Sequence, residues 1–151
     1  MRIVLDLVLD CDVDHAWSLL HSPAAMRFAM SPVLDPTPVD GAWPERWPAA
    51  TPVALSTRMA GVPSGRMTVE LHDEVRGDVR IVHDRGGPVS GPLAALSSWR
   101  HRMAVSPLPD GRTRFRDRLD VGGVAAPAVW PTLWALWQWR GHRLQVLARR
   151  P

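Results

Sequence analysis

The sequence predicts an α+β domain, in which a curved antiparallel sheet wraps around one long C-terminal helix. Three observations predict this fold class. Most periodic segments alternate apolar and polar residues, as strands with one buried face do. Two short helical segments follow the first strand, and one long helical segment covers roughly residues 127–149. A chain of 151 residues is the size of one domain, so we assign residues 1–151 to a single domain.

The N-terminal part begins with a strand, "RIVLDLVLD", whose one face carries Ile3, Leu5, Leu7 and Leu9. Asp12 suits the N-cap of a helix in "DVDHAWSLL", and Pro23 suits the start of a second helix in "HSPAAMRFAM". Six prolines between residues 32 and 52 predict a loop. Trp43 and Trp47 in this loop are expected to pack onto the protein.

Five further strands are expected in the middle of the chain, in "VALSTRMA", "RMTVELHDE", "GDVRIVHD", "SWRHRMAV" and "RTRFRDRLDV". The second of them places Met67, Val69 and Leu71 on one face. The third places Val79, Ile81 and His83 on one face, opposite Asp78, Arg80 and Asp84.

The last two strands form a hairpin whose register is predictable from its turn. The "PDG" turn, with Gly111 in the left-handed position, predicts a three-residue loop. The resulting register pairs Trp99 with Val121, His101 with Leu119, Met103 with Asp117, and Val105 with Phe115. The other face carries Arg100, Arg102, Arg112, Arg114, Arg116 and Arg118. Acids to balance them are expected from Glu70, Glu74, Asp78 and Asp84.

We interpret these arginines as the solvated convex face of the sheet, and we predict no nucleic-acid partner. A nucleic-acid surface stacks aromatic rings among its basic residues, whereas Trp99 and Phe115 are expected on the opposite face. The computed pI of 10.8 reflects the absence of lysine and tyrosine, because almost nothing then titrates in the alkaline range. The net charge at pH 7 is only +3.

The inner face of the sheet combines apolar side chains with one polar pair. Its members are Met67, Leu71, Trp99, His101, Met103, Phe115 and Asp117. The long helix adds a stripe made of Trp130, Leu133, Trp134, Trp137, Gly141 and Leu144. Such side chains either line a pocket or fill a core. His101 and Asp117 either satisfy each other, close a ligand pocket or act as an acid–base pair.

Three stretches resemble the START-like superfamily, also called SRPBCC or polyketide cyclase/dehydrase-like. "VDHAWSLL" resembles the entry into its first helix, and "WQWRGHRLQVL" resembles the end of its last helix, where an aromatic and an arginine recur as Trp139 and Arg140 do here. "SSWRHRMAVSPLPDGRTRFRDRLDV" resembles its penultimate hairpin through Trp99, His101, Asp110, Gly111, Thr113 and Asp117. Met103 stands where many members have a second histidine.

The resemblance implies a helix-grip fold with a cavity between the sheet and the long helix. Members of this superfamily bind apolar or amphipathic molecules such as lipids, sterols, polyketides and hormones, and some cyclise or dehydrate polyketides. We therefore expect a hydrophobic small molecule as the partner, with a lipid-, isoprenoid- or polyketide-like structure. The expected ligand-binding residues are Phe28, Met67, Leu71, Trp99, His101, Met103, Phe115, Trp130, Trp134 and Trp137.

Two alternatives remain open at the sequence level. The first is a cyclase or dehydratase that uses His101 and Asp117 as an acid–base pair. The second is a scaffold with a filled core that acts through protein contacts, with the Trp43–Trp47 loop as the place to look.

No metal or cofactor is expected. The six histidines have no paired ligand spacing, Cys11 is the only cysteine, and no glycine-rich phosphate motif is present. No apolar run approaches the ~20 residues of a membrane helix. The first residues do not resemble a signal peptide, which favours a cytoplasmic protein.

Overall fold

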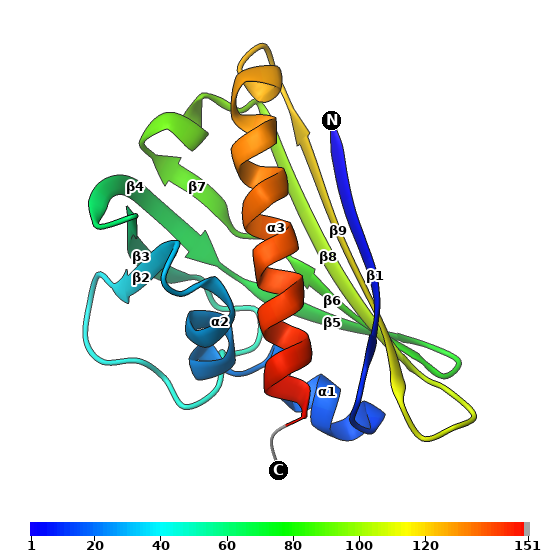
Figure 1. Cartoon of the computed structure of the whole chain (residues 1–151). Helices are drawn as coiled ribbons and strands as arrows, with labels where there is room; N and C mark the ends of the chain where they lie inside the picture. The colour runs from blue at the N-terminus through cyan, green and yellow to red at the C-terminus, as the bar shows by residue number, and fades with distance from the viewer. Residues whose placement is uncertain (150–151) are drawn as a thin grey trace.

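In the computed structural model, which describes residues 1–149, the long C-terminal helix α3 (Ala126–Ala148) lies across the concave side of antiparallel strands (Figure 1). Two helices, α1 (Val13–Leu20) and α2 (Pro23–Met30), follow strand β1 (Arg2–Leu9). The remaining elements are β2 (Leu34–Pro38), β3 (Val53–Met59), β4 (Val62–Val69), β5 (Leu71–Arg76), β6 (Val79–Asp84), β7 (Gly87–Ser90), the short 3-10 helix η1 (Pro92–Ala95), β8 (Ser98–Pro107) and β9 (Thr113–Gly122). This arrangement confirms the predicted helix-grip α+β fold.

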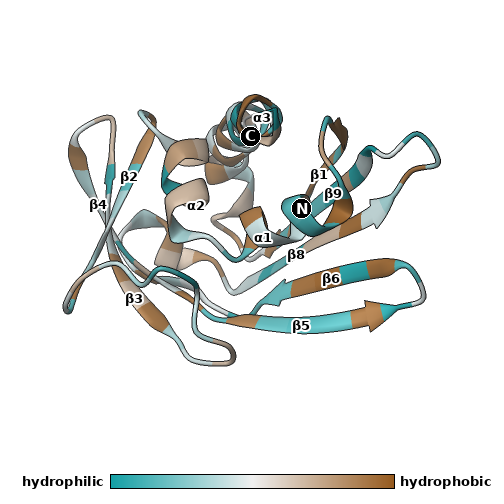
Figure 2. Ribbon diagram, turned by 90° about the horizontal axis from the view of Figure 1, so that it is seen from below, coloured by the Kyte–Doolittle hydropathy of each residue, from teal (hydrophilic) through white to brown (hydrophobic). Residues whose placement is uncertain are grey.

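The strands form two sheets that together make a grip. A five-stranded sheet has the order β1-β9-β8-β6-β5, and a four-stranded sheet has the order β2-β3-β4-β7. The strand expected over residues 66–74 is divided at Glu70, because β4 belongs to one sheet and β5 to the other. Figure 2 looks at the molecule from below and shows α3, with α1 and α2, between the two sheets.

The two short helices begin where their capping residues predict. The Asp12 carboxylate accepts a hydrogen bond from the His15 amide at 2.8 Å, and the Ser22 hydroxyl accepts one from the Ala25 amide at 3.1 Å. These caps satisfy backbone groups that the first helical turn leaves unpaired. They fix the starts of α1 at Val13 and of α2 at Pro23.

The predicted hairpin register is confirmed. Trp99 stands opposite Val121, His101 opposite Leu119, and Met103 opposite Asp117. Gly111 has a φ of 80°, which is the left-handed conformation that the turn requires. His101, Met103 and Asp117 are buried on the inner face. The alternation of side chains therefore directs the hairpin arginines to the outer face.

The face assignment of β6 is corrected by the structure. Asp84 stands opposite His101 and is buried on the inner face, whereas His83 contacts Glu74 on the outside at 2.8 Å. Ile81 and Val82 are both buried, so the hydrophobic alternation of this strand does not reveal which face is inner. The acids beside the hairpin arginines come mainly from β1 and from the hairpin itself, because β1 pairs with β9.

Two strands were not expected from the sequence. β2 lies in the predicted proline-rich loop, and β7 follows β6. Both are edge strands of the smaller sheet, where a missing proline N–H costs no ladder hydrogen bond. The expected packing of the loop tryptophans is confirmed, since Trp47 is buried and Trp43 meets it edge to face at 6.1 Å between ring centroids.

The buried face of α3 differs from the predicted stripe at one tryptophan. Trp134 is 47% exposed, because it lies about 100° around the helix from Leu133. Arg140 takes an inner place instead and is buried. Gly141 lets the helix approach β1 closely, since a Cβ there would lie 3.0 Å from side-chain atoms of Leu5 and Leu7.

Candidate functional site

An apolar pocket of about 230 Å³ lies between α3 and the smaller sheet. Its walls come from α2, α3, η1 and strands β2, β3, β4, β7 and β8. Most of the lining side chains are apolar, including Met30, Met59, Met67, Leu93, Trp99 and Leu133. Methionine side chains adapt their shape to what they contact, so this wall suits a variable apolar surface.

A second, smaller chamber of about 70 Å³ adjoins this pocket. Met30, Met67, Trp99 and Trp137 line both spaces and form the boundary between them. The far side of the inner chamber contains the polar groups Asp84, His101 and Arg140. The two spaces together resemble one cavity with an apolar body and a polar end.

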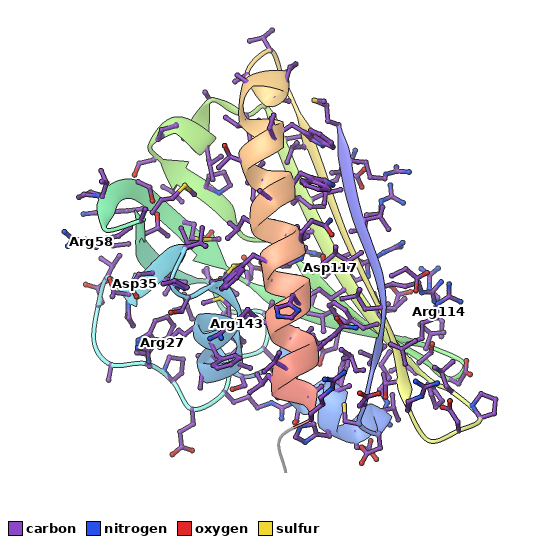
Figure 3. All side chains as sticks on the ribbon, viewed as in Figure 1. Arg27, Asp35, Arg58, Arg114, Asp117 and Arg143 are labelled. Carbon is purple, nitrogen blue, oxygen red and sulfur yellow. The ribbon has the colours of Figure 1, made fainter. Side chains whose placement is uncertain are left out.

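The polar end is anchored by Asp117, which is completely buried. His101 Nε2 lies 2.9 Å from Asp117 Oδ1, and Trp137 Nε1 donates to the same oxygen at 3.2 Å. Arg140 forms an ion pair with Asp117 Oδ2 and donates a hydrogen bond to the Met103 sulfur at 3.0 Å. Figure 3 shows Asp117 between α3 and the strands, as a link across the core.

Burial lowers the pKa of Arg140 to about 10, with the nearby Asp84 charge opposing this shift. The guanidinium is therefore still charged at pH 7 and neutralises Asp117. A buried carboxylate with several donors needs no proton of its own, so Asp117 acts only as an acceptor.

Burial also affects the protonation of His101. Burial lowers its pKa below the ordinary value of 6.5; the nearby Asp84 carboxylate, which would accept a hydrogen from the protonated ring, opposes the shift, and the Arg140 charge adds to it. His101 is thus neutral at pH 7. Because Asp117 only accepts, we assign the hydrogen of the neutral ring to Nε2, which leaves Nδ1 unprotonated.

The remaining polar atoms at the chamber are acceptors. Asp84 Oδ1 accepts hydrogen bonds from the backbone amides of Glu70 and Gly86, at 3.1 and 3.0 Å. Asp84 Oδ2 lies 3.5 Å from His101 Nδ1, which is longer than an ordinary hydrogen bond. An unprotonated nitrogen and a carboxylate oxygen therefore stand side by side without a hydrogen between them.

Trp99 offers one unused donor. Its indole Nε1 is buried and has no hydrogen-bond partner among residues 1–149. The side chain contributes to both the pocket and the inner chamber. Unpaired buried donors are uncommon, so this indole is a candidate contact for an acceptor atom of a ligand.

The structure divides the sequence-predicted ligand residues into two groups. The lining of one or both spaces includes Met67, Leu71, Trp99, His101, Met103 and Trp137. The other four lie elsewhere. Phe115 is enclosed in the core, and Trp134 is exposed. The Trp130 indole donates to the Arg2 carbonyl at 3.4 Å, and the Arg143 guanidinium carbon lies 3.8 Å from the centroid of the Phe28 ring.

Sequence reasoning missed Asp84, Arg140 and the methionine of α2, Met30. Asp84 was placed on the outer face with the wrong alternation. Arg140 is absent from the predicted stripe of α3, although its spacing of three residues from Trp137 and four from Leu144 marks the buried face. Met30 has no signal in the sequence, because it reaches the pocket only through the packing of α2.

The described residues show neither a metal-ligand cluster nor a membrane-spanning helix. No group of three or more potential metal ligands gathers among residues 1–149. No helix in that part of the chain is long and apolar enough to cross a membrane.

No protein-family model matches this chain, and no curated protein matches it. Solved structures match it over nearly its full length. A hypothetical protein from Helicobacter pylori is 15% identical, with a TM-score of 0.70, over 99% of this chain and 88% of that chain. A Chromobacterium violaceum protein is 14% identical, with a TM-score of 0.68, over 99% and 98%.

Norcoclaurine synthase from Thalictrum flavum, solved as a point mutant in complex with a transition-state analogue, also matches. It is 10% identical, with a TM-score of 0.66, over 98% of this chain and 93% of that chain. At such low identities the likeness supports the helix-grip fold and carries no activity over to this chain.

Proposed function

We propose that residues 1–151 form a START-like domain that binds a small, mainly apolar molecule with a hydrogen-bond donor at one end. The observation that carries this proposal is the apolar pocket of about 230 Å³, continued by a chamber that ends at Asp84 and His101. An apolar cavity of about 150 Å³ already holds benzene, so the pocket has room for a larger ring system or a short isoprenoid or polyketide chain.

The polar end of the cavity supports a ligand that carries a hydrogen-bond donor. Asp84 Oδ2 and His101 Nδ1 lie 3.5 Å apart and are both acceptors when the ring hydrogen is on Nε2, so neither donates to the other. A ligand hydroxyl or ammonium group would supply the missing hydrogen. A ligand with only acceptor atoms at this end would leave buried polar groups unpaired, which costs about 1–3 kcal/mol for each group.

Native mass spectrometry of freshly purified protein is the first experiment. We expect a bound molecule, which extraction would identify, or else saturable binding of N-phenyl-1-naphthylamine, an uncharged apolar probe. An unoccupied protein that also fails to bind the probe would contradict the proposal and favour a filled core.

A pair of matched variants places the probe in the pocket. Ala128 lines the pocket on α3, and Ala135 is exposed on the same helix outside it. Ala128→Trp fills part of the pocket and should weaken probe binding by about tenfold or more, whereas Ala135→Trp should leave it unchanged. Equal effects of the two variants would mean that the probe binds elsewhere.

A second function is favoured by the orientation of His101. With the hydrogen of Nε2 directed to Asp117, Nδ1 is available as a base beside Asp84, at the chamber where the ligand is proposed to bind. This arrangement suits proton abstraction in a cyclase or dehydratase acting on a polyketide-like substrate. The molecule identified by mass spectrometry is the substrate to test. His101→Ala should retain most of the binding, through Asp84 and the apolar pocket, and lose turnover; unchanged turnover would exclude the enzyme.

A further inference from the structure

The outer face of the larger sheet has two halves that differ in how their arginines are paired. Beside β1, Arg114 contacts Asp6 with an Nε–Oδ1 distance of 2.9 Å. Arg2 and Arg118 both contact Asp120, at 2.7 and 2.6 Å. These arginines therefore have protein partners, as expected for a solvated surface of mixed charge.

On the other half, three arginines have no acidic partner. Within residues 1–149, no ion pair involves Arg85, Arg100 or Arg102. All three line one open hollow of about 480 Å³, together with Arg118, Asp84 and Asp120. Uncommitted guanidinium groups thus gather at a concave place on the surface.

The hollow exists because β6 leaves the sheet early. Pairing of β6 with β8 ends where Asp84 meets His101, and the chain then crosses to β7 in the smaller sheet. Gly86 makes this departure possible, since a Cβ there would lie 2.1 Å from the Thr68 carbonyl oxygen. The first residues of β8 are left without a β6 neighbour, and Arg100 stands at this gap.

The charges in the hollow favour an anion. Four arginines and two aspartates leave a formal charge of +2 with the histidines neutral. Both carboxylates are already engaged, Asp84 by two backbone amides and Asp120 by Arg2 and Arg118. Arg102 stands directly opposite Arg118, a like-charge pair that is unfavourable unless a counter-charge lies nearby.

We propose that this hollow is a binding site for a phosphate-bearing anion, held by Arg85, Arg100 and Arg102. The planar guanidinium group donates two parallel hydrogen bonds to phosphate oxygens, which makes arginine the fitting residue for such a ligand. The site goes beyond the apolar pocket of the proposed function: its arginines lie on the outer face of the sheet, at the gap beside β8, where the hollow adjoins the inner chamber. The anion is either free in solution or the head group of a lipid.

The hollow and the inner chamber share three side chains, Asp84, Trp99 and His101. His101 therefore reports on the outer site without contributing to its charge at pH 7. His142, which is exposed on α3 and lines neither space, provides the matched reference.

The test is a titration of the full chain with inorganic pyrophosphate at low ionic strength, followed by calorimetry. We expect saturable binding that Arg100→Gln/Arg102→Gln weakens by about tenfold or more. The control, Arg112→Gln/Arg114→Gln, removes the same two charges from the same face outside the hollow and should change affinity by less than about twofold. In parallel, the NMR signals of the His101 ring should shift and those of His142 should not.

A second arm uses vesicles of phosphatidylcholine with and without phosphatidylglycerol. If only pyrophosphate binds in a way that depends on Arg100 and Arg102, the ligand is a free anion. If only the anionic vesicles do so, the ligand is a lipid head group. Equal losses of affinity in the two double variants would mean that binding depends only on net charge, and would overturn the proposed site. So would the absence of saturable binding to either probe, or His101 signals that stay unmoved at saturation.

Discussion

Strand β9 carries an aspartate–arginine contact on each of its faces, and the two contacts have different physical meanings. Asp117 and Arg140 are both buried, together with His101 and Trp137, between the sheet and α3. Arg114 and Asp6 are both about half exposed, and Figure 3 shows Arg114 on the side of the strands away from α3. The same two side-chain types therefore build a polar end for a pocket on one face and a solvated surface on the other.

The largest difference in stability is expected when the aspartate of each contact is replaced by alanine. Asp117→Ala leaves Arg140 buried without its counter-charge and should lower the free energy of unfolding by about 3–5 kcal/mol. Asp6→Ala removes the partner of a guanidinium that water already solvates, so it should lower the free energy of unfolding much less. Urea denaturation of both variants at pH 7 checks this prediction. Comparable losses would mean that the inner contact is less enclosed than its burial indicates.

A smaller effect is expected from removing one donor to Asp117. Trp137→Phe keeps an aromatic ring in the core but removes the indole hydrogen bond to the carboxylate. The loss should be about 1.5–3 kcal/mol, the usual range for a hydrogen bond to a charged group. Trp134→Phe on the exposed face of the same helix is the control and should leave the unfolding midpoint unchanged.

The pH dependence of stability sharpens the comparison further. The pKa of His101 is lowered in the folded state, chiefly by burial, so the unfolded chain takes up the proton first as the pH falls. Stability should therefore fall as the pH drops below about 6.5. In His101→Gln, urea denaturation between pH 5.5 and 7.5 should show a flatter dependence, with the other histidines as an internal reference. An equally steep dependence would assign the proton uptake to another group.

The outer contact also carries a pH signature, of the same sign but in a more acidic range. The hydrogen bond from Arg114 holds the pKa of Asp6 below its ordinary value, against the opposing effect of burial, and the charges of Arg114 and Arg116 add to the lowering. The stabilisation is present above the unfolded pKa of about 3.9 and is lost as the pH falls through the lower folded value.

Salt should produce the smallest effect. Raising the ionic strength from 0.1 to 1 M shortens the screening length from about 10 to about 3 Å. The small destabilisation by Asp6→Asn should then shrink towards zero, whereas that by Asp117→Asn should persist because solvent ions cannot reach it. Unfolding midpoints of both variants at the two salt concentrations measure the difference. Equal salt sensitivity would show that ions enter the core.

Local rules predicted the hairpin best. A three-residue turn with Gly111 and the alternation of strand residues were enough to place Met103 opposite Asp117 and both His101 and Asp117 on the inner face. The structure then shows His101 Nε2 at 2.9 Å from that carboxylate. The same alternation failed for β6, because Ile81 and Val82 are both buried. Where both faces of a strand are covered, apolar residues stop marking the inner one.

The order of strands and helices, the hairpin register and the outward arginines follow from periods of 2 and 3.6 residues and from turn chemistry, which act between near neighbours in the chain. Other features were visible only in the folded molecule. They are the division of β4 from β5, the position of Asp84 on the inner face beside His101, and the burial of Arg140 in place of Trp134. They depend on which elements pack against each other. The free energy of such long-range contacts cannot be predicted from the residue spacing within one segment.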